Sequence, residues 1–216
     1  CDAATGAYEV TGVTYVGEPV ITAYLASDAA SPEATVAVLD ERTGTGITTG
    51  NDMVVNRPDV VDGSLLVLIA GKDDDPVFNT LAGWTQIDSL GNTAGDDLAN
   101  GAWYKVVTDA STEPLTYTFT ATDTTEAYSY WIGSLLNVDI SDPLATSTGW
   151  STLINPVDAA APSLTTTNDG SLVFAAAYVF ANSAIELPLG SWNTEVDNLV
   201  DPSSGHSLNI SSKTLP

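Results

Sequence analysis

Apolar and polar residues alternate along much of the chain, most clearly in residues 115–122, Leu-Thr-Tyr-Thr-Phe-Thr-Ala-Thr. Successive side chains of a β-strand point to opposite faces, so this pattern predicts a strand with one face on a core and the other in water. Threonine suits the wet face because it is polar and β-branched. Residues 64–70 and 172–180 are instead almost continuously apolar. This second pattern indicates strands that are covered on both faces.

The same criteria predict further strands, whereas a helical period is hard to find. These strands cover residues 9–16, 20–25, 34–39, 53–56, 84–89, 102–108, 127–138 and 207–211. Turn-forming pairs such as Asp62-Gly63 and Asn100-Gly101 separate them. Short strands with frequent turns predict an all-β protein, specifically an antiparallel β-sandwich of jelly-roll type.

One motif occurs twice in the chain. Residues 62–67 read Asp-Gly-Ser-Leu-Leu-Val, and residues 169–174 read Asp-Gly-Ser-Leu-Val-Phe. A glycine–tryptophan element follows each copy, Gly83-Trp84 in the first and Gly190-Ser191-Trp192 in the second. A repeated order of turn, buried strand, loop and tryptophan strand predicts two related half-sandwiches.

The second half-repeat is shorter than the first, because only the weak strand at 207–211 follows its tryptophan. A long unpaired sheet edge promotes aggregation, so other strands must cover it. The strands in residues 9–39 can do this within one chain or in a neighbouring subunit. Alternatively, the missing strands lie beyond Pro216. We therefore predict an N-terminal strand segment, 1–45, open to exchange between subunits, and a β-sandwich domain, 46–216.

Several short segments carry a resemblance to a known domain family. They are Asp62–Ala70, Ala82–Thr85, Trp103–Val106, Tyr117–Ala121 and Asn137–Pro143. Over residues 50–212 the chain resembles a jelly-roll-like domain of phage virion proteins, in appendages or decorations, and of bacterial surface proteins. It departs from that pattern where Leu81-Ala82 replaces the usual proline context and Asn137 replaces a glycine. The resemblance implies a jelly-roll-like sandwich in a surface assembly, and it brings no catalytic motif.

The chain is strongly acidic, with 28 Asp and Glu against 5 Lys and Arg and a formal net charge of −23. Such a surface repels phosphates and anionic lipids, so nucleic acid is not an expected partner. No apolar run reaches the ~18 residues of a membrane span. The charge is typical of secreted, marine or halophilic proteins, and we expect an extracellular location on a virion or cell surface. Cys1 fits either a lipid-modified N-terminus or an arbitrary one.

Acidic clusters in loops are the main chemical feature of the sequence. The candidate metal ligands are Asp73, Asp74, Asp75, Asp96, Asp97, Asp139 and Asp142. Loops at one end of a sandwich can bring their oxygens together, and Ca²⁺ takes six to eight oxygen ligands. Calcium is therefore the one cofactor that the sequence suggests. The alternative is that these loops are simply solvated.

Aromatic residues give the candidate ligand-binding positions. Trp150 lies in a loop-like stretch, and Trp131 lies in a strand whose consecutive aromatics point to opposite faces. An exposed tryptophan at either place would mark a subunit contact or a site for surface glycans. Core packing is the alternative for most of the aromatic residues.

Catalytic groups are scarce. The single histidine, His206, precedes Ser207, but there is no second histidine to act as a base and no elbow motif. We therefore predict a non-enzymatic structural or adhesive subunit of an extracellular assembly, a virion appendage or cell-surface filament, that associates with copies of itself by strand pairing. A carbohydrate-binding module, with or without calcium, is the alternative, and a hydrolase ranks last.

Overall fold

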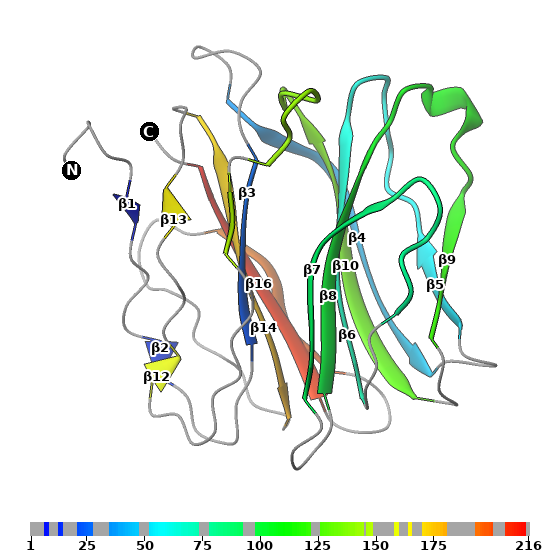
Figure 1. Ribbon diagram of the computed structural model, residues 1–216. Helices are drawn as coiled ribbons and strands as arrows, with labels where there is room; N and C mark the ends of the chain where they lie inside the picture. Colours follow the sequence, from blue (N-terminus) through cyan, green and yellow to red (C-terminus); the bar gives the residue numbers. More distant parts are fainter. Residues whose placement is uncertain are drawn as a thin grey trace.

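The computed structural model shows an all-β protein in which two antiparallel sheets of five strands pack face to face (Figure 1). It describes residues 7–8, 13–14, 21–27, 35–47, 52–73, 78–92, 98–121, 126–144, 146–148, 158–159, 164–165, 170–180, 193–200 and 206–214. The predicted β-sandwich is therefore confirmed. The jelly-roll subtype stays a prediction.

The described strands, and the one short helical turn among the described residues, follow in chain order. They are β1 (Ala7–Tyr8), β2 (Val13–Thr14), β3 (Ile21–Ser27), β4 (Ala37–Ile47), β5 (Asp52–Asn56), β6 (Leu65–Asp73), β7 (Thr85–Asn92), β8 (Leu98–Val106), the 3₁₀ turn η1 (Ala110–Thr112), β9 (Thr116–Thr120), β10 (Ala127–Leu136), β11 (Thr146–Thr148), β12 (Asp158–Ala159), β13 (Leu164–Thr165), β14 (Leu172–Phe180), β15 (Asn193–Val200) and β16 (His206–Thr214). The first large sheet has the order β4-β10-β6-β8-β7, and the second has the order β11-β3-β14-β16-β15.

The two large sheets have the same topology. Strands β6, β7 and β8 correspond to β14, β15 and β16, and in both sheets the third strand lies between the other two. Leu65 faces Val106 in the first sheet and Leu172 faces Thr214 in the second, so the counterparts lie 107 and 108 positions apart. Even the bulge is repeated, between Gln86 and Asp88 in β7 and between Thr194 and Val196 in β15. The half-repeats predicted from the sequence are thus repeated structural units.

The N-terminal strands complete the second unit from within the same chain. Strand β3 pairs with β14 as β10 pairs with β6, and Ser27, opposite Leu172, lies 108 positions before Leu135, opposite Leu65. The two-stranded sheets β1–β13 and β5–β9 show the same relation. Tyr8 faces Leu164 in the first, and Thr116 faces Asn56 in the second. We call β4–β10 unit A, and β11–β16 together with β1–β3 unit B.

This arrangement shows how the edge of β14 is covered in the folded chain. The edge of β14 is covered within one chain by β3, so the chain as folded here does not need a neighbour to pair that strand. Strand β4 is built into the first sheet beside β10. The predicted boundary at residue 45 therefore falls inside a strand, and the N-terminal segment is part of both sheets.

The core consists of layers. Between the two large sheets lie Val67, Ile69 and Trp131 from unit A, with Phe174 and Ile210 from unit B. On the outer face of the unit A sheet, the two-stranded sheet of β5 and β9 covers a second apolar cluster, which contains Met53, Val55, Tyr117 and Phe119 from these two strands and Leu66, Leu68 and Ile132 from the large sheet. The small pairs β1–β13 and β2–β12 lie outside the unit B sheet in the same way (Figure 1).

Local sequence explains these elements. Strand β9 alternates exposed threonines with buried Tyr117 and Phe119, as predicted, and β6 is buried at almost every position. Both Asp-Gly turns place their glycine in the left-handed region, Gly63 at φ 82° and Gly170 at φ 80°, where a Cβ is disfavoured. Asn137 has φ 62°. Asparagine tolerates this conformation better than most other residues.

Candidate functional site

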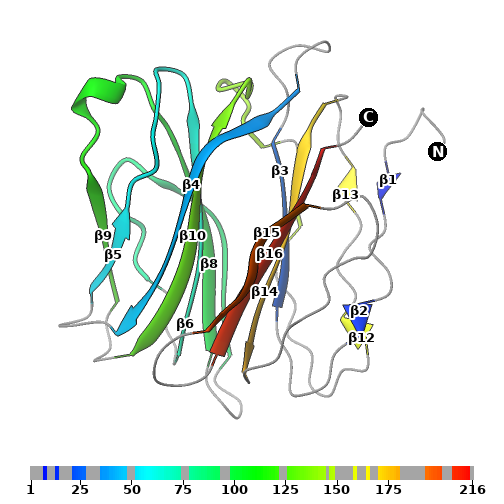
Figure 2. The same ribbon diagram turned by 180° about the vertical axis from the view of Figure 1, so that it is seen from behind.

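Strand β4 is the longest strand described, and it forms an edge of the unit A sheet (Figure 2). Among the residues that the structure describes, β10 is its only ladder partner. Its eleven residues exceed the usual strand length of about 5–6 residues. Leu39 and Ile47, near its two ends, are 39% and 46% exposed. A long edge strand with apolar side chains can pair with a strand of another chain.

The two halves of β4 differ in charge. In the first half, Arg42 Nη1 lies 2.6 Å from Asp40 Oδ1, and the Asp59 backbone N–H donates to Asp40 at 2.7 Å. Charged side chains of this kind protect sheet edges from wrong pairing. The second half, residues 43–47, reads Thr-Gly-Thr-Gly-Ile and carries no charge. This uncharged stretch is the part of β4 best suited to strand addition.

Two glycines in the uncharged half fit against aromatic rings. A Cβ on Gly44 would lie 2.5 Å from Tyr130 Cε1, and a Cβ on Gly46 would lie 2.7 Å from the Tyr128 hydroxyl oxygen. The Tyr130 hydroxyl in turn accepts a hydrogen bond from the backbone N–H of Asn56 at 3.1 Å. The rings therefore fill one face of β4 and leave Thr43 and Thr45 exposed on the other.

A pair of carboxyl groups joins the edge strands of the two sheets. Glu41 of β4 and Glu195 of β15 share a side-chain hydrogen bond. Trp131 Nε1 donates to Glu41 Oε2 at 2.7 Å, and the Ser212 hydroxyl donates to Glu195. Burial and the Glu41 carboxyl raise the pKa of Glu195, while the Ser212 hydrogen bond opposes this shift. A second carboxyl group in contact with Glu195 favours the protonated form of Glu195, because two negative charges repel.

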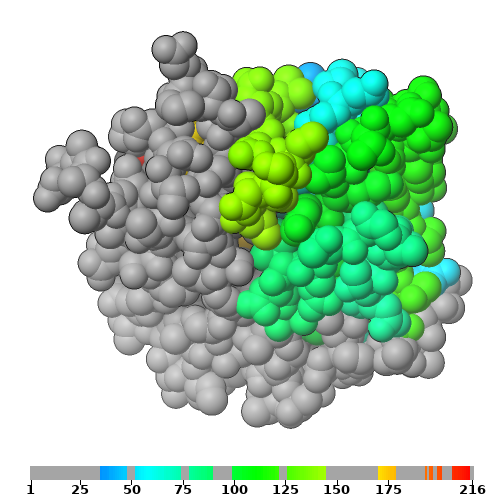
Figure 3. All heavy atoms as spheres, turned by 45° about the horizontal axis from the view of Figure 1, so that its top comes forward, coloured from blue at the N-terminus to red at the C-terminus, as the bar shows by residue number. Residues whose placement is uncertain are grey.

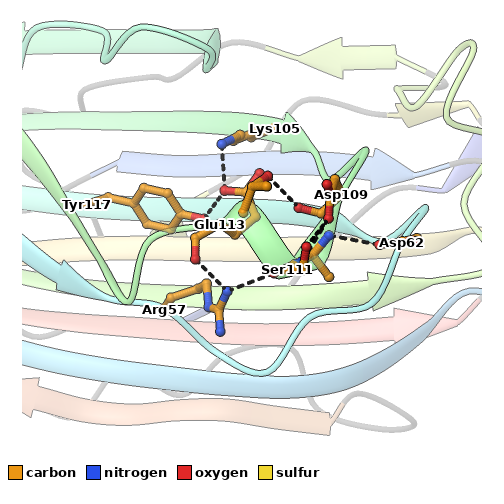
Figure 4. Close-up of polar contacts among 9 residues, drawn as sticks. Arg57, Asp62, Lys105, Asp109, Ser111, Glu113 and Tyr117 are labelled. Carbon is orange, nitrogen blue, oxygen red and sulfur yellow. Dashed lines mark hydrogen bonds and ion pairs between the residues drawn. The ribbon is translucent and has the colours of Figure 1, made fainter.

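A polar network surrounds η1 at one end of unit A (Figure 4). Glu113 Oε2 accepts from Lys105 Nζ at 2.6 Å and from the Tyr117 hydroxyl at 2.8 Å. The Glu113 backbone carbonyl accepts from Arg57 Nη1 at 3.0 Å. Burial, with the Glu113 hydrogen bond and charge, raises the pKa of Tyr117. The Asp62 carboxylate receives the Ala110 N–H at 2.8 Å, which fixes the start of η1. This network holds the strand pair β5–β9 against the large sheet of unit A.

The only histidine lies in the interior. His206 stacks on Tyr178, with ring centroids 5.7 Å apart, and both side chains are buried. Tyr178 packs against Gly71 of the facing sheet, so His206 points between the sheets, and Ser207, the next residue of the strand, points to the opposite face. His206 therefore cannot act as the base for Ser207.

The predicted metal ligands are only partly described. Of those described, Asp139 and Asp142 share one turn, whereas Asp73 lies at the opposite end of the β6–β10 ladder. Asp139 Oδ1 accepts from Ser141 N–H at 3.0 Å and from its hydroxyl at 2.6 Å, and these bonds lower the pKa of Asp139. Asp142 is exposed in the same turn, and Asp73 ends β6. Figure 3 shows the segment of this turn, in yellow-green, on the surface. Asp74, Asp75, Asp96 and Asp97 lie outside the described residues. Within the described part of the chain, no three acidic, histidine or cysteine residues form a metal-binding group.

The predicted aromatic ligand sites have different outcomes. Trp131 is 0% exposed, and its ring packs on Phe174 of the other sheet with centroids 5.0 Å apart. The expectation of an exposed Trp131 is therefore corrected: its alternating position places it on the inner face, where the second sheet covers it. Trp84 and Trp103 are buried as well. Trp150 lies outside the described residues, so its role as a glycan contact stays a prediction.

Comparison with protein-family models, with curated proteins and with solved structures gives no match for this chain. The resemblance to phage virion and bacterial surface domains therefore stays a prediction from the sequence. Among the described residues, no helix has the length and apolar character of a membrane span.

The sequence did not single out the residues of the two polar clusters. Glu41 and Glu195 lie 154 positions apart and meet only because the edge strands of the two sheets face each other. For the Glu113 network a signal existed, since the chain has only five basic residues and each needs a carboxylate or carbonyl partner once it is buried. Of these basic residues, Lys105 and Arg57 are the two that bond to Glu113.

Proposed function

We propose that this protein is a non-catalytic structural or adhesive subunit of an extracellular assembly, a virion appendage or a cell-surface filament, and that it associates with copies of itself by strand pairing. The observation that carries the proposal is the edge strand β4, with an uncharged stretch at residues 43–47. Its backbone groups on the side away from β10 face no strand among the described residues. A second copy supplies a β4 of the same length, and two such edges are self-complementary in a two-fold arrangement.

The net charge sets the conditions for this association. At −23, copies of the chain repel one another over about a Debye length, roughly 10 Å at 0.1 M salt. Salt screens this repulsion and leaves the backbone hydrogen bonds between strands intact. Self-association that strengthens with ionic strength is therefore expected, as suits a protein outside the cell in saline surroundings.

The test measures the mass of the particles by light scattering coupled to size exclusion, over a range of protein and salt concentrations. The variant Thr43→Asp/Thr45→Asp puts like charges on the pairing edge, where cross-strand repulsion opposes pairing. The control Thr108→Asp/Thr118→Asp adds the same charge at exposed positions away from β4. We expect the parent and the control to gain mass with salt and concentration, and the β4 variant to stay monomeric with an unchanged circular dichroism spectrum. A parent protein that is monomeric under every condition would refute the proposal.

The structure favours the assembly hypothesis over the carbohydrate-binding alternative. The three described tryptophans, Trp84, Trp103 and Trp131, are core residues, so none of them presents a ring face to a sugar. The glycan hypothesis now depends on aromatic residues outside the described part of the chain, Trp150 above all.

A further inference from the structure

Unit B is built from two pieces of chain that are far apart in sequence. Strands β11–β16 form most of it, but the positions that β9 and β10 hold in unit A are filled by β1, β2 and β3. All of unit A lies between these two pieces in the chain. Strand β3 is an inner strand, between β11 and β14, and its seven residues all face partners in β14. Unit B therefore lacks an inner strand whenever this segment is not supplied.

The segment that fills this position leads into unit A on its C-terminal side. It leads into β4 through residues 28–36, and within this connection the Val36 N–H donates to the Gly170 carbonyl at 3.0 Å. An element that completes a sheet formed elsewhere in the chain, and that another unit separates from that sheet in the sequence, can be exchanged between identical copies, since both copies keep every contact.

We propose that residues 7–27 of one copy can complete unit B of a second copy, so that copies are linked by exchange of the strands β1–β3. Each exchanged strand makes the same ladder that it makes within one chain, β1 with β13, β2 with β12 and β3 with β14, so exchange removes no hydrogen bond of these ladders. Reciprocal exchange gives a dimer, and one-directional exchange gives a chain of copies, which suits a filament. This inference rests on the proposed assembly function, but it uses a different surface from β4.

The register of the β3–β14 ladder supplies the test. Ala23 faces Ala176 and Thr22 faces Ala177. Hydrogen-bonded and non-hydrogen-bonded pairs alternate along an antiparallel ladder, so one of these two neighbouring pairs has the short Cα separation that a disulfide accepts. Both are tested in a Cys1→Ser background, which removes the native thiol.

In the experiment, the Ala23→Cys protein and the Ala176→Cys protein are unfolded together, refolded at high concentration and oxidised, and Thr22→Cys with Ala177→Cys is treated in the same way. Neither copy alone contains both thiols, so a disulfide joining the two copies requires exchange. The control mixes Val54→Cys with Thr118→Cys, which face each other inside unit A and report random cross-linking. We expect a covalent heterodimer above the control level, with the β3–β14 disulfide identified by mass spectrometry of the peptides.

The double variants carrying both cysteines of a pair separate the outcomes. If mixed copies give no heterodimer above the control while a double variant closes fully within one chain, exchange is overturned and closure within one chain stands. If neither double variant closes in any form, β3 does not lie beside β14 and the inference also fails. Pairing through β4 is unaffected by either result, because none of these residues lies on that strand, so failure of the exchange and failure of the proposed function are distinguishable.

Discussion

The ring of Tyr178 in unit B lies directly against Gly71 in unit A, and a Cβ on residue 71 would be 2.5 Å from Tyr178 Cγ. Tyr178 is fully buried and stacks on His206, so the ring has no free space to move into. Gly71 lies in β6 between Ser129 of β10 and Asn100 of β8. The absence of a side chain at this position lets the two sheets approach each other.

This contact predicts that Gly71→Ala destabilises the protein. The added methyl group overlaps a buried ring, and overpacking of this kind costs about 1–3 kcal/mol. For a chain of this size the melting temperature should fall by roughly 2–4 °C for each kcal/mol. Thermal unfolding followed by circular dichroism measures the change. The double-mutant cycle with Tyr178→Leu is the control: a smaller ring-free side chain should relieve part of the Gly71→Ala cost, and strict additivity would contradict the contact.

The carboxyl pair predicts a pH dependence with a definite sign. The folded state binds the proton of Glu195 more tightly than the unfolded chain, where the carboxyl has its ordinary pKa of 4.5. The stabilisation that this gives is complete below pH 4.5 and is lost as the pH rises through the raised folded pKa. Glu195→Gln keeps an acceptor for Ser212 and a donor for Glu41 without the charge. We expect Glu195→Gln to be more stable than the parent at pH 7 and to lose this part of the pH dependence.

Urea unfolding curves from pH 4 to pH 8 measure this effect. The control Asp142→Asn removes one negative charge from an exposed position, so it corrects for the fall in net charge. If Asp142→Asn flattens the profile as much as Glu195→Gln does, the effect is due to general charge and the Glu41–Glu195 pair is not its source.

The network around Glu113 predicts a large effect from one carboxylate. Lys105 and Glu113 side chains are 20% and 7% exposed, so their ion pair is largely shielded from water. Glu113→Gln leaves the Lys105 ammonium without its counter-charge, and we expect a loss of about 1–3 kcal/mol. The matched control is Arg42→Gln, which breaks the exposed Asp40 pair and should cost about 1 kcal/mol or less. Equal losses in the two variants would contradict the structure.

The effect of Glu113 on the pKa of Tyr117 gives a second measurement of this network. Burial and Glu113 together raise the pKa of Tyr117. Removing the Glu113 charge should lower that pKa, so one tyrosine should ionise earlier in an alkaline absorbance titration of Glu113→Gln. The control Arg42→Gln, whose contacts are with Asp40 and the Glu41 carbonyl, should leave this titration unchanged.

The sequence predicted strands where a local pattern exists. Alternation identified β9, and continuous apolar runs identified β6 and β14, because burial on one face or on two determines residue type directly. The repeated Asp-Gly turns identified the two units. Strands as short as β12 and β13 have too few positions to show a period. The pairing of β3 with β14 could not be derived, because pairing across units depends on the whole fold.

The residues of the candidate site also depend on tertiary contacts that a local pattern does not show. A strand pattern does not say which side chains on an edge will meet, so Glu41 and Glu195 were not identified. Trp131 was expected at the surface because consecutive aromatics must face opposite ways. Both faces of β10 are in fact covered. The second large sheet covers one face, and the strand pair β5–β9 covers the other. The covering elements come from distant parts of the chain, and local sequence does not report them.

The relation between the units predicts that the chain tolerates a change in the order of its segments. In unit A, eight residues join Val106 to Leu115, and in unit B the corresponding positions are Leu215 and Pro216 together with residues 1–6, also eight. A permuted protein that begins at Thr35 and continues from Pro216 directly into residues 1–34 therefore keeps a connection of the same length. We expect it to fold with the same circular dichroism spectrum and a melting temperature within a few degrees of the parent.

A matched control opens the chain between Leu68 and Ile69, in the middle of the buried strand β6, and should not fold, because the cut interrupts a ladder on both sides. A permuted protein that begins at Thr35 but fails to fold, although the parent folds under the same conditions, would mean that β1–β3 do not hold the place in unit B that β9 and β10 hold in unit A. The permuted protein also places β16 and β1 next to each other in the chain, so β1–β3 are connected directly to the other strands of their own unit B, with unit A no longer between them. Exchange of β3 between copies should then disappear, while association through β4 persists, and light scattering of the permuted protein measures that difference directly.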